Sequence, residues 1–173
     1  MKPITILMIF IGCLAGSGWA STGSPSPTPQ AKTANSSASL FQSAVSAYER
    51  KNYPVALKIF TELAEQGDAD AQFNLGLMYY NGEGVPKNAS QAVTWYRKAA
   101  EQGDAKAQFN LGVMYANGEG VPKDYVQAAK WFYLGKANGV EADEAIRQIE
   151  SRMSRQQIEQ AQALATEWWQ NHH

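Results

Sequence analysis

The sequence is poor in the two residues that most often build metal centres and nucleophilic active sites. Cysteine occurs once, at Cys13, and histidine only as the terminal pair His172 and His173. A single cysteine cannot form an intramolecular disulfide, and residues 40–169 contain no Cys–His or Ser–His pair to activate a nucleophile. Two terminal histidines without rigid partners give no defined metal geometry. We therefore expect no catalytic residues, no metal site and no cofactor.

An excess of positive charge is also absent. The 173 residues carry a formal net charge of -1, and 18% of them are charged while 45% are hydrophobic. Nucleic-acid binding depends on Lys and Arg side chains that neutralise phosphates, so this composition argues against it. The same composition suits one soluble domain and excludes a chain that is fibrous or disordered throughout.

The N-terminus has the pattern of a secretory signal peptide. Lys2 precedes an apolar run over residues 4–14, and small residues follow, ending in Gly18-Trp19-Ala20. A positive start, a short apolar stretch and a small–x–small end define such signals. The run is shorter than the about 20 apolar residues that a transmembrane helix needs. We expect a signal peptide over residues 1–20, cleavage after Ala20, and export to the periplasm or secretion.

A second interpretation of the same segment stays open. Ile11-Gly12-Cys13 resembles a bacterial lipoprotein box, in which the cysteine is lipidated and becomes the first residue. Phe10 stands where leucine is usual, and the preceding signal would be short. Cys13 would then carry a lipid anchor, and the protein would be an outer-membrane lipoprotein. Under both interpretations the protein leaves the cytoplasm.

The segment after the signal contains almost nothing that a core could bury. Residues 21–39 consist mainly of Ser, Thr, Pro and Ala. Such a composition is typical of a flexible tether. We predict a disordered linker over residues 21–39.

Two stretches of 36 residues are nearly the same. Residues 68–103 align without a gap on residues 104–139, and 21 of the 36 positions are identical. A period of this length is typical of solenoids built from helix pairs. The predicted fold class is therefore all-α, an α-solenoid.

The first helix of each unit begins after an aspartate and has one apolar face. Asp68 and Asp104 suit the N-cap, because their carboxylates can accept the free amide protons of the first turn. The apolar face is made of Ala71, Leu75, Met78 and Tyr79 in one unit, and of Ala107, Leu111, Met114 and Tyr115 in the next. Gly76 and Gly112 lie inside these helices, where Gly costs about 1 kcal/mol against Ala. They indicate that a neighbouring helix approaches closely.

The second helix of each unit begins after Asn88 or Asp124. Each is followed three residues later by a glutamine, which resembles a capping box. Gly103 and Gly139 then follow the two helices, where a left-handed glycine commonly ends a helix.

Between the two helices, both units read Asn-Gly-Glu-Gly-Val-Pro-Lys, at residues 81–87 and 117–123. A Gly-rich loop can hold a phosphate, and Glu83 and Glu119 could form a pair of catalytic carboxylates. A phosphate loop follows a strand and leads directly into a helix, whereas a helix precedes this loop and a proline interrupts it. We interpret the loop as the joint of each helix pair, with Glu83 and Lys87 on its exposed side.

Divergent units are predicted on both sides of the two repeats. Residues 40–67 fit the same period as a divergent first repeat with a short turn. Residues 140–169 are predicted to form C-terminal capping helices, and Ser154 to Gln157 reads as the capping box of the last one. A divergent end is expected because the final unit of a solenoid has to cover an exposed apolar face.

The units are similar to the SEL-one-like repeat (SLR) family, a relative of the tetratricopeptide repeats. The match rests on A-x-x-x-LG-x-x-Y from Ala71 to Tyr79, on G-x-GV from Gly82 to Val85 and on A-x-x-W from Ala92 to Trp95, all repeated in the second unit. The resemblance implies a right-handed superhelix of antiparallel helix pairs that binds proteins or peptides as an adaptor. It also implies a bacterial protein of the envelope or of host interaction, and a concave surface lined by the first helix of each pair.

Candidate contacts for a partner are the first-helix positions beside the apolar face. They combine apolar side chains with amides that could hold a peptide backbone. They are Asp70, Phe73, Asn74, Leu77 and Tyr80 in one unit, and Lys106, Phe109, Asn110, Val113 and Ala116 in the next. The alternative is that Phe73 and Phe109 belong to the core between helices, and that Asn74 and Asn110 bond the next repeat.

These observations favour a non-enzymatic protein with a protein or peptide partner. Two alternatives remain. A cell-wall-directed hydrolase would have to use Glu83 and Glu119, which lie in turns without an apolar pocket to raise a carboxyl pKa. A structural envelope lipoprotein would self-associate through the ends of the solenoid.

The two interpretations of the N-terminus predict different mature proteins. Cleavage after Ala20 leaves a free Ser21, whereas lipoprotein processing leaves a lipidated Cys13. We predict that mass spectrometry of the mature protein finds a free Ser21 at its N-terminus. A mass that includes a diacylated Cys13 would contradict this prediction.

Overall fold

The computed structural model describes the chain from Pro29 to His172, and over this range it contains eight helices and no strand. The helices are α1 (Pro29–Glu49), α2 (Tyr53–Glu65), α3 (Ala69–Asn81), α4 (Ala89–Glu101), α5 (Ala105–Asn117), α6 (Tyr125–Ala137), α7 (Asp143–Glu150) and α8 (Arg155–His172). The predicted signal peptide and Cys13 lie outside the described residues. No helix in the described range is both long and apolar enough to span a bilayer.

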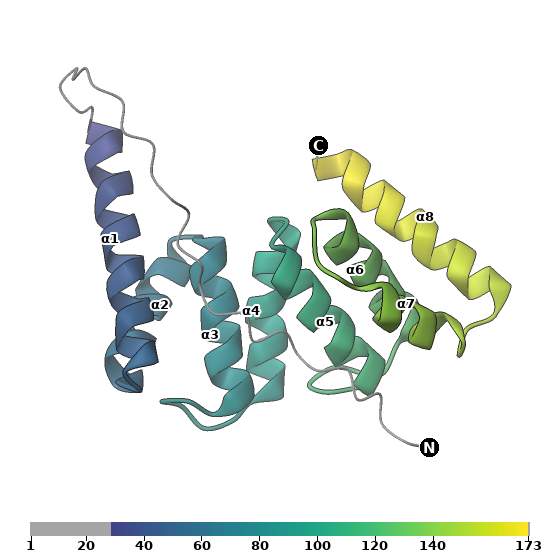
Figure 1. The fold of residues 1–173 in the computed structure, drawn as a ribbon, viewed down its shortest axis with the longest axis horizontal. Helices are drawn as coiled ribbons and strands as arrows, with labels where there is room; N and C mark the ends of the chain where they lie inside the picture. Colours follow the sequence, from purple (N-terminus) through teal and green to yellow (C-terminus); the bar gives the residue numbers. More distant parts are fainter. Residues whose placement is uncertain (1–28, 173) are drawn as a thin grey trace.

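The helices form a solenoid of pairs. Each helix from α1 to α6 packs on the next, and α6 then packs on both α7 and α8. Figure 1 shows the pairs following one another from α1 at one end of the long axis to α8 at the other. The predicted all-α solenoid with C-terminal capping helices is confirmed.

The predicted helix starts are confirmed in detail, with one difference. The carboxylates of Asp68 and Asp104 accept the amide protons of Ala71 and Ala107, at 2.8 and 2.6 Å. Asn88 likewise accepts from the Gln91 amide at 3.1 Å, but its own N–H donates to the carbonyl of Tyr79 and not to the glutamine side chain. The capping box is therefore half formed there, because the chain entering the second helix already provides an acceptor.

The apolar face of each first helix is buried against the preceding pair. Ala71, Leu75 and Met78 of α3 share one core cluster with Phe60 and its neighbours on α2. Gly76 faces the other way: a Cβ there would lie 2.7 Å from the Tyr96 ring of α4, and one at Gly112 would lie 2.7 Å from the Phe132 ring of α6. The close approach predicted from these glycines is confirmed, and an aromatic ring of the same pair fills the space.

The first pair ends the solenoid with a polar face. Aligning Phe41 with Phe73 places serines on α1 where α3 has its apolar face: Ser39, Ser43 and Ser46 stand for Ala71, Leu75 and Met78. All three serines are exposed, and they line an open hollow of about 710 Å³. This face is therefore mainly polar, and the exposed Val55 of α2 also lines the hollow.

One predicted boundary differs. The linker was expected to extend to residue 39, but α1 begins at Pro29. Proline is tolerated in the first turn of a helix because its missing N–H has no helical partner there. After Pro29 the segment contains no further proline and no glycine up to residue 49, so nothing in the chain stops the helix.

Candidate functional site

The repeated loop needs its glycines for two reasons. Gly82 ends α3 in the left-handed conformation with φ +78°, and Gly84 follows with φ +75°. In addition, a Cβ at Gly84 would lie 2.9 Å from Tyr53, and one at Gly120 would lie 2.5 Å from the backbone of Ala89. The loop therefore docks on the first turn of the second helix in the preceding pair, at α2 and again at α4.

Glu83 fixes this docking with three hydrogen bonds. The hydroxyls of Tyr48 and Tyr53, at the end of α1 and the start of α2, donate to its two carboxylate oxygens at 2.6 and 3.1 Å. The Asn81 amide donates to the same group at 3.1 Å. The expectation that Glu83 lies on the exposed side is wrong. Its side chain is half-buried because it bridges two repeats, while Lys87 is exposed as expected.

Glu119 repeats the arrangement one unit later. The Tyr80 hydroxyl donates to it at 2.9 Å and the Asn117 amide at 3.2 Å. Tyr80 stands in α3 where Tyr48 stands in α1, next to the last residue of the helix. We call these contacts, Tyr48 and Tyr53 with Glu83 and Tyr80 with Glu119, the tyrosine–glutamate ladder.

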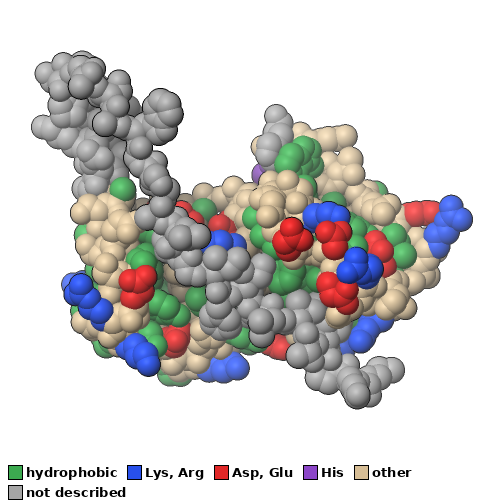
Figure 2. Space-filling view, viewed as in Figure 1, with side chains coloured by type: hydrophobic (Ala, Val, Ile, Leu, Met, Phe, Trp, Pro, Cys, Tyr) green, Lys and Arg blue, Asp and Glu red, His purple; other side chains and the backbone are tan. Residues whose placement is uncertain are grey.

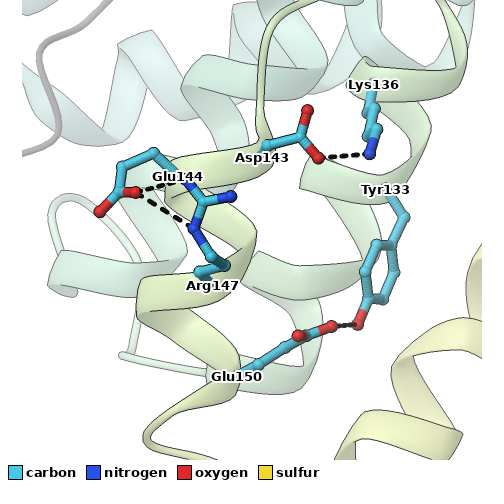
Figure 3. A network of polar contacts seen from close by, with 6 residues as sticks. All are labelled: Tyr133, Lys136, Asp143, Glu144, Arg147 and Glu150. Atoms are coloured by element: carbon cyan, nitrogen blue, oxygen red, sulfur yellow. Dashed lines mark hydrogen bonds and ion pairs between the residues drawn. The ribbon is translucent and has the colours of Figure 1, made fainter.

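Different polar contacts hold the closing helices. Figure 3 shows the Tyr133 hydroxyl of α6 donating to Glu150 of α7, at 2.6 Å. Lys136 of α6 is paired with Asp143 at the start of α7, and Glu144 with Arg147 within α7. The predicted capping box of α8 is complete, since Ser154 and Gln157 exchange hydrogen bonds of 2.8 and 3.3 Å.

A second polar ladder runs through the interior, and it was not predicted from the sequence. The buried Gln72 amide donates to the Ala64 carbonyl of α2 at 3.0 Å and accepts from Gln102 at 2.8 Å. Gln108 repeats both contacts with Ala100 and Asn138. The signal available in the sequence was a polar residue repeated beside the apolar face. A glutamine can be buried there because it satisfies carbonyl groups at the end of the preceding helix.

Six of the ten predicted contact residues are buried. Phe73, Leu77, Phe109, Asn110 and Val113 are each at most 7% exposed. The reason is that each interior first helix has neighbours on two sides. Phe73 lies 5.8 Å from the Tyr96 ring and Phe109 lies 5.3 Å from the Phe132 ring of the same pair. The alternative that both phenylalanines are core is therefore correct. Ala116 is also fully buried.

The two candidate asparagines differ. Asn74 is partly exposed and its amide donates to the Asp70 carbonyl one turn earlier, at 2.8 Å. Asn110 is fully buried without a hydrogen-bond partner among the described residues. It lies close to the buried Tyr96 hydroxyl, whose pKa is raised by burial and partly lowered again by this amide. Neither asparagine bonds the next repeat.

Four predicted contact residues keep an accessible surface. Asp70 is exposed, and Asn74, Tyr80 and Lys106 are partly exposed. The equivalent residues on α1 were not predicted as contacts, yet their side chains are more exposed. Phe41 and Val45 are partly exposed and Gln42 is exposed, whereas their counterparts on α3 and α5 are largely buried. The accessible stripe is thus Phe41, Gln42, Val45, Asp70, Asn74, Tyr80 and Lys106, and it widens toward the N-terminal end.

One face of the described chain carries no concentrated charge of one sign (Figure 2). Figure 2 shows acidic and basic side chains interspersed over the described part of one face. No group of His, Cys, Asp and Glu residues within the described range could hold a metal ion. Glu83 and Glu119, the only candidate catalytic carboxylates, are both engaged by tyrosine hydroxyls.

Comparison with protein families gives one match. The Sel1 repeat, the same unit as the SEL-one-like repeat, matches residues 46–68, 69–104 and 105–140. The last two matched segments begin one residue after the boundaries set above, and the first covers most of the divergent unit. A comparison with curated proteins finds no match.

Two solved bacterial structures resemble this chain over most of its length. A protective antigen of uropathogenic Escherichia coli strains with an SLR fold is 32% identical, with a TM-score of 0.73. The match covers 80% of this chain and 31% of that one. A Sel1 repeat protein from Oxalobacter formigenes is 38% identical, with a TM-score of 0.62 over 69% of this chain and 50% of that one. This chain therefore spans at most half the length of either.

A third structure, cysteine-rich protein B of Helicobacter pylori, shares the fold. It is 23% identical with a TM-score of 0.52, and the match covers 69% of this chain and 97% of that one.

The tyrosine–glutamate ladder predicts which of two conservative substitutions lowers the free energy of unfolding more. Glu83→Gln and Glu119→Gln each replace an acceptor oxygen by an amide donor and remove a charge-assisted hydrogen bond, which costs about 1–3 kcal/mol. Glu83 has three donors and Glu119 two, so we expect Glu83→Gln to lower the free energy of unfolding more. Urea denaturation of both variants measures this. The reverse order, or no loss in either, would contradict it.

The ladder also predicts a loss of stability in alkali. Burial and the hydrogen bond to Glu119 raise the pKa of Tyr80 from 10.0 to about 12. A phenol whose pKa is raised by folding contributes stability in full below its unfolded pKa, and this is lost as the pH rises through the folded pKa. We expect the free energy of unfolding to fall between about pH 10 and about pH 12, and to fall less steeply in Tyr80→Phe. Identical pH profiles for the two proteins would contradict this.

Proposed function

The chain belongs to the Sel1 repeat family, and on that basis we propose that it is an exported, non-enzymatic protein that binds a protein or peptide partner along its accessible stripe. Sel1 repeats typically form scaffolds for protein–protein interaction. Export is supported by the signal-peptide pattern of residues 1–20. The E. coli relative is described as a protective antigen, which agrees with a place outside the cytoplasm. A periplasmic or secreted adaptor is the form we favour, and a lipoprotein anchored at Cys13 is the alternative.

The observation that carries this proposal is the chemistry of the stripe. Asp70 and Lys106 place opposite charges on neighbouring repeats, and Gln42 and Asn74 place amides at equivalent positions on α1 and α3. The Asn74 oxygen has no hydrogen-bond partner among the described residues, because only its nitrogen is used within the helix. Amides of this kind can bond both the N–H and the C=O of an extended peptide, while Phe41 and Val45 offer apolar contact.

The enzymatic and self-associating alternatives have less support. The carboxylates of Glu83 and Glu119 are half-buried acceptors that join neighbouring repeats through tyrosine hydroxyls. End-to-end stacking would meet a mainly polar face at α1, where three serines and Val55 are exposed. A binding role agrees with the accessible amide, charged and apolar side chains of the stripe.

Substitutions on the stripe should remove partner binding without unfolding the protein. We predict that Gln42→Ala, Asn74→Ala and Lys106→Ala together lower the yield of a crosslinked partner from envelope extracts by about tenfold, since contacts near the centre of an interface dominate affinity. Quantitative mass spectrometry of the captured proteins measures this. The matched control is Gln156→Ala with Gln160→Ala on the exposed side of α8.

Circular dichroism of the triple variant has to show unchanged helicity. Capture that survives the triple substitution, or that is lost equally in the α8 control, would contradict a binding role for the stripe. Glycan hydrolysis by the purified protein that disappears in Glu83→Gln would favour the hydrolase instead.

A further inference from the structure

The tyrosine–glutamate ladder has a final position at which the loop is missing. Tyr53, Ala89 and Tyr125 are the first residues of α2, α4 and α6, spaced 36 residues apart. The loop of the following unit docks on Tyr53 and on Ala89, where Gly84 and Gly120 make their close approaches. No third Asn-Gly-Glu-Gly loop follows α6 in the sequence. The first turn of α6 therefore lacks the glutamate loop that covers the first turns of α2 and α4.

Two cations lie beside Tyr125, at the position where the other repeats place a glutamate. The Lys123 ammonium lies 5.5 Å from the centre of the Tyr125 ring. Arg152, in the turn after α7, lies close enough to the Tyr125 hydroxyl to lower its pKa. Both cations are exposed, and Tyr125 is partly exposed. The Tyr125 hydroxyl has a proton to donate to an acceptor.

The pKa shifts of these tyrosines differ in direction because their charged neighbours differ in sign. Burial and hydrogen bonding to Glu83 raise the pKa of Tyr48 and of Tyr53. The pKa of Tyr125 is lowered instead, first by Arg152 and then by Lys123. The charged groups that act on this phenol are both cations.

Two carboxylates that neighbour these residues in the sequence have hydrogen-bond donors of their own. Asp124 caps α6 by accepting from the Gln127 amide at 3.0 Å. Glu150 accepts from the Tyr133 hydroxyl at 2.6 Å. Lys123, Tyr125 and Arg152 thus form a cluster with two positive charges and one hydroxyl donor at a site where this fold elsewhere seats a glutamate.

We propose that Lys123, Tyr125 and Arg152 form a docking surface for an acidic segment of a partner protein. A glutamate of that segment accepts from the Tyr125 hydroxyl and pairs with Arg152 and Lys123, at α6, as Glu83 accepts from Tyr53 at α2. The charge complementarity of two cations with one carboxylate selects this occupant. The surface is separate from the accessible stripe and does not depend on the function proposed for it.

The probe is the loop sequence of the chain itself, as the blocked peptide acetyl-NGEGVP-amide, because this segment seats on the first turn of a second helix twice in the fold. Titration into isotope-labelled protein is followed by NMR. We expect saturable shifts centred on Lys123, Tyr125 and Arg152, with a dissociation constant on the order of 1 mM. The peptide acetyl-NGQGVP-amide should bind about tenfold more weakly, since it lacks the charge.

Three protein variants distinguish binding at this site from non-specific attraction of the acidic peptide to surface cations. Arg152→Glu should abolish the shifts, and Tyr125→Phe should weaken them while the fold is kept. Arg155→Ala removes an equally exposed cation nearby, which is paired with Glu159 at 2.9 Å, and should leave them unchanged. No saturable shift at the three residues, equal binding of the two peptides, or equal loss in Arg155→Ala would overturn the proposal. Concentration-dependent dimerisation lost in Arg152→Glu would overturn it too, because the occupant would then be a second copy of the chain.

Discussion

The backbone contact between each inter-helix loop and the preceding helix pair is the constraint on which this solenoid depends. Gly84 and Gly120 bring the loop so close to the first turn of α2 and α4 that a Cβ has no room. The contact places Glu83 within reach of two tyrosines and Glu119 within reach of one. A buried apolar face alone would leave neighbouring helices free to slide, whereas directional hydrogen bonds fix one register.

The same repeat has different surfaces at different places in the stack. A first helix with neighbours on both sides buries most of the positions that a single repeat would leave open, as Phe109 and Asn110 show on α5. At the N-terminal end, α1 keeps Gln42 open and faces water with serines. At the C-terminal end, Tyr125 meets cations where its counterpart meets a carboxylate. The accessible surfaces that we propose for binding are therefore most distinct where the repeat pattern stops.

The sequence predicted the elements of the fold well and the candidate site poorly, for a physical reason. Caps such as Asp68, the apolar face of each helix and the left-handed glycines are local features that one segment determines. Whether Phe73 is core or surface depends on how many helices surround α3, which no local pattern records. The tyrosine–glutamate ladder and the hydrogen bond between Gln72 and Gln102 were not predicted for the same reason, since the partners lie about 30 residues apart in the chain. The family resemblance supplied the pairing of helices but not these contacts.

The claim that the joints hold the repeats together is tested most directly by a double-mutant cycle on Tyr80 and Glu119, which lie on neighbouring repeats and share a hydrogen bond of 2.9 Å. The free energy of unfolding is measured for Tyr80→Phe, Glu119→Gln and the double variant. If the contact joins the repeats, the two losses are not additive, and the coupling energy is about 1 kcal/mol or more. Losses that add within about 0.3 kcal/mol would show that the two residues act independently, and would contradict the role given to the joint.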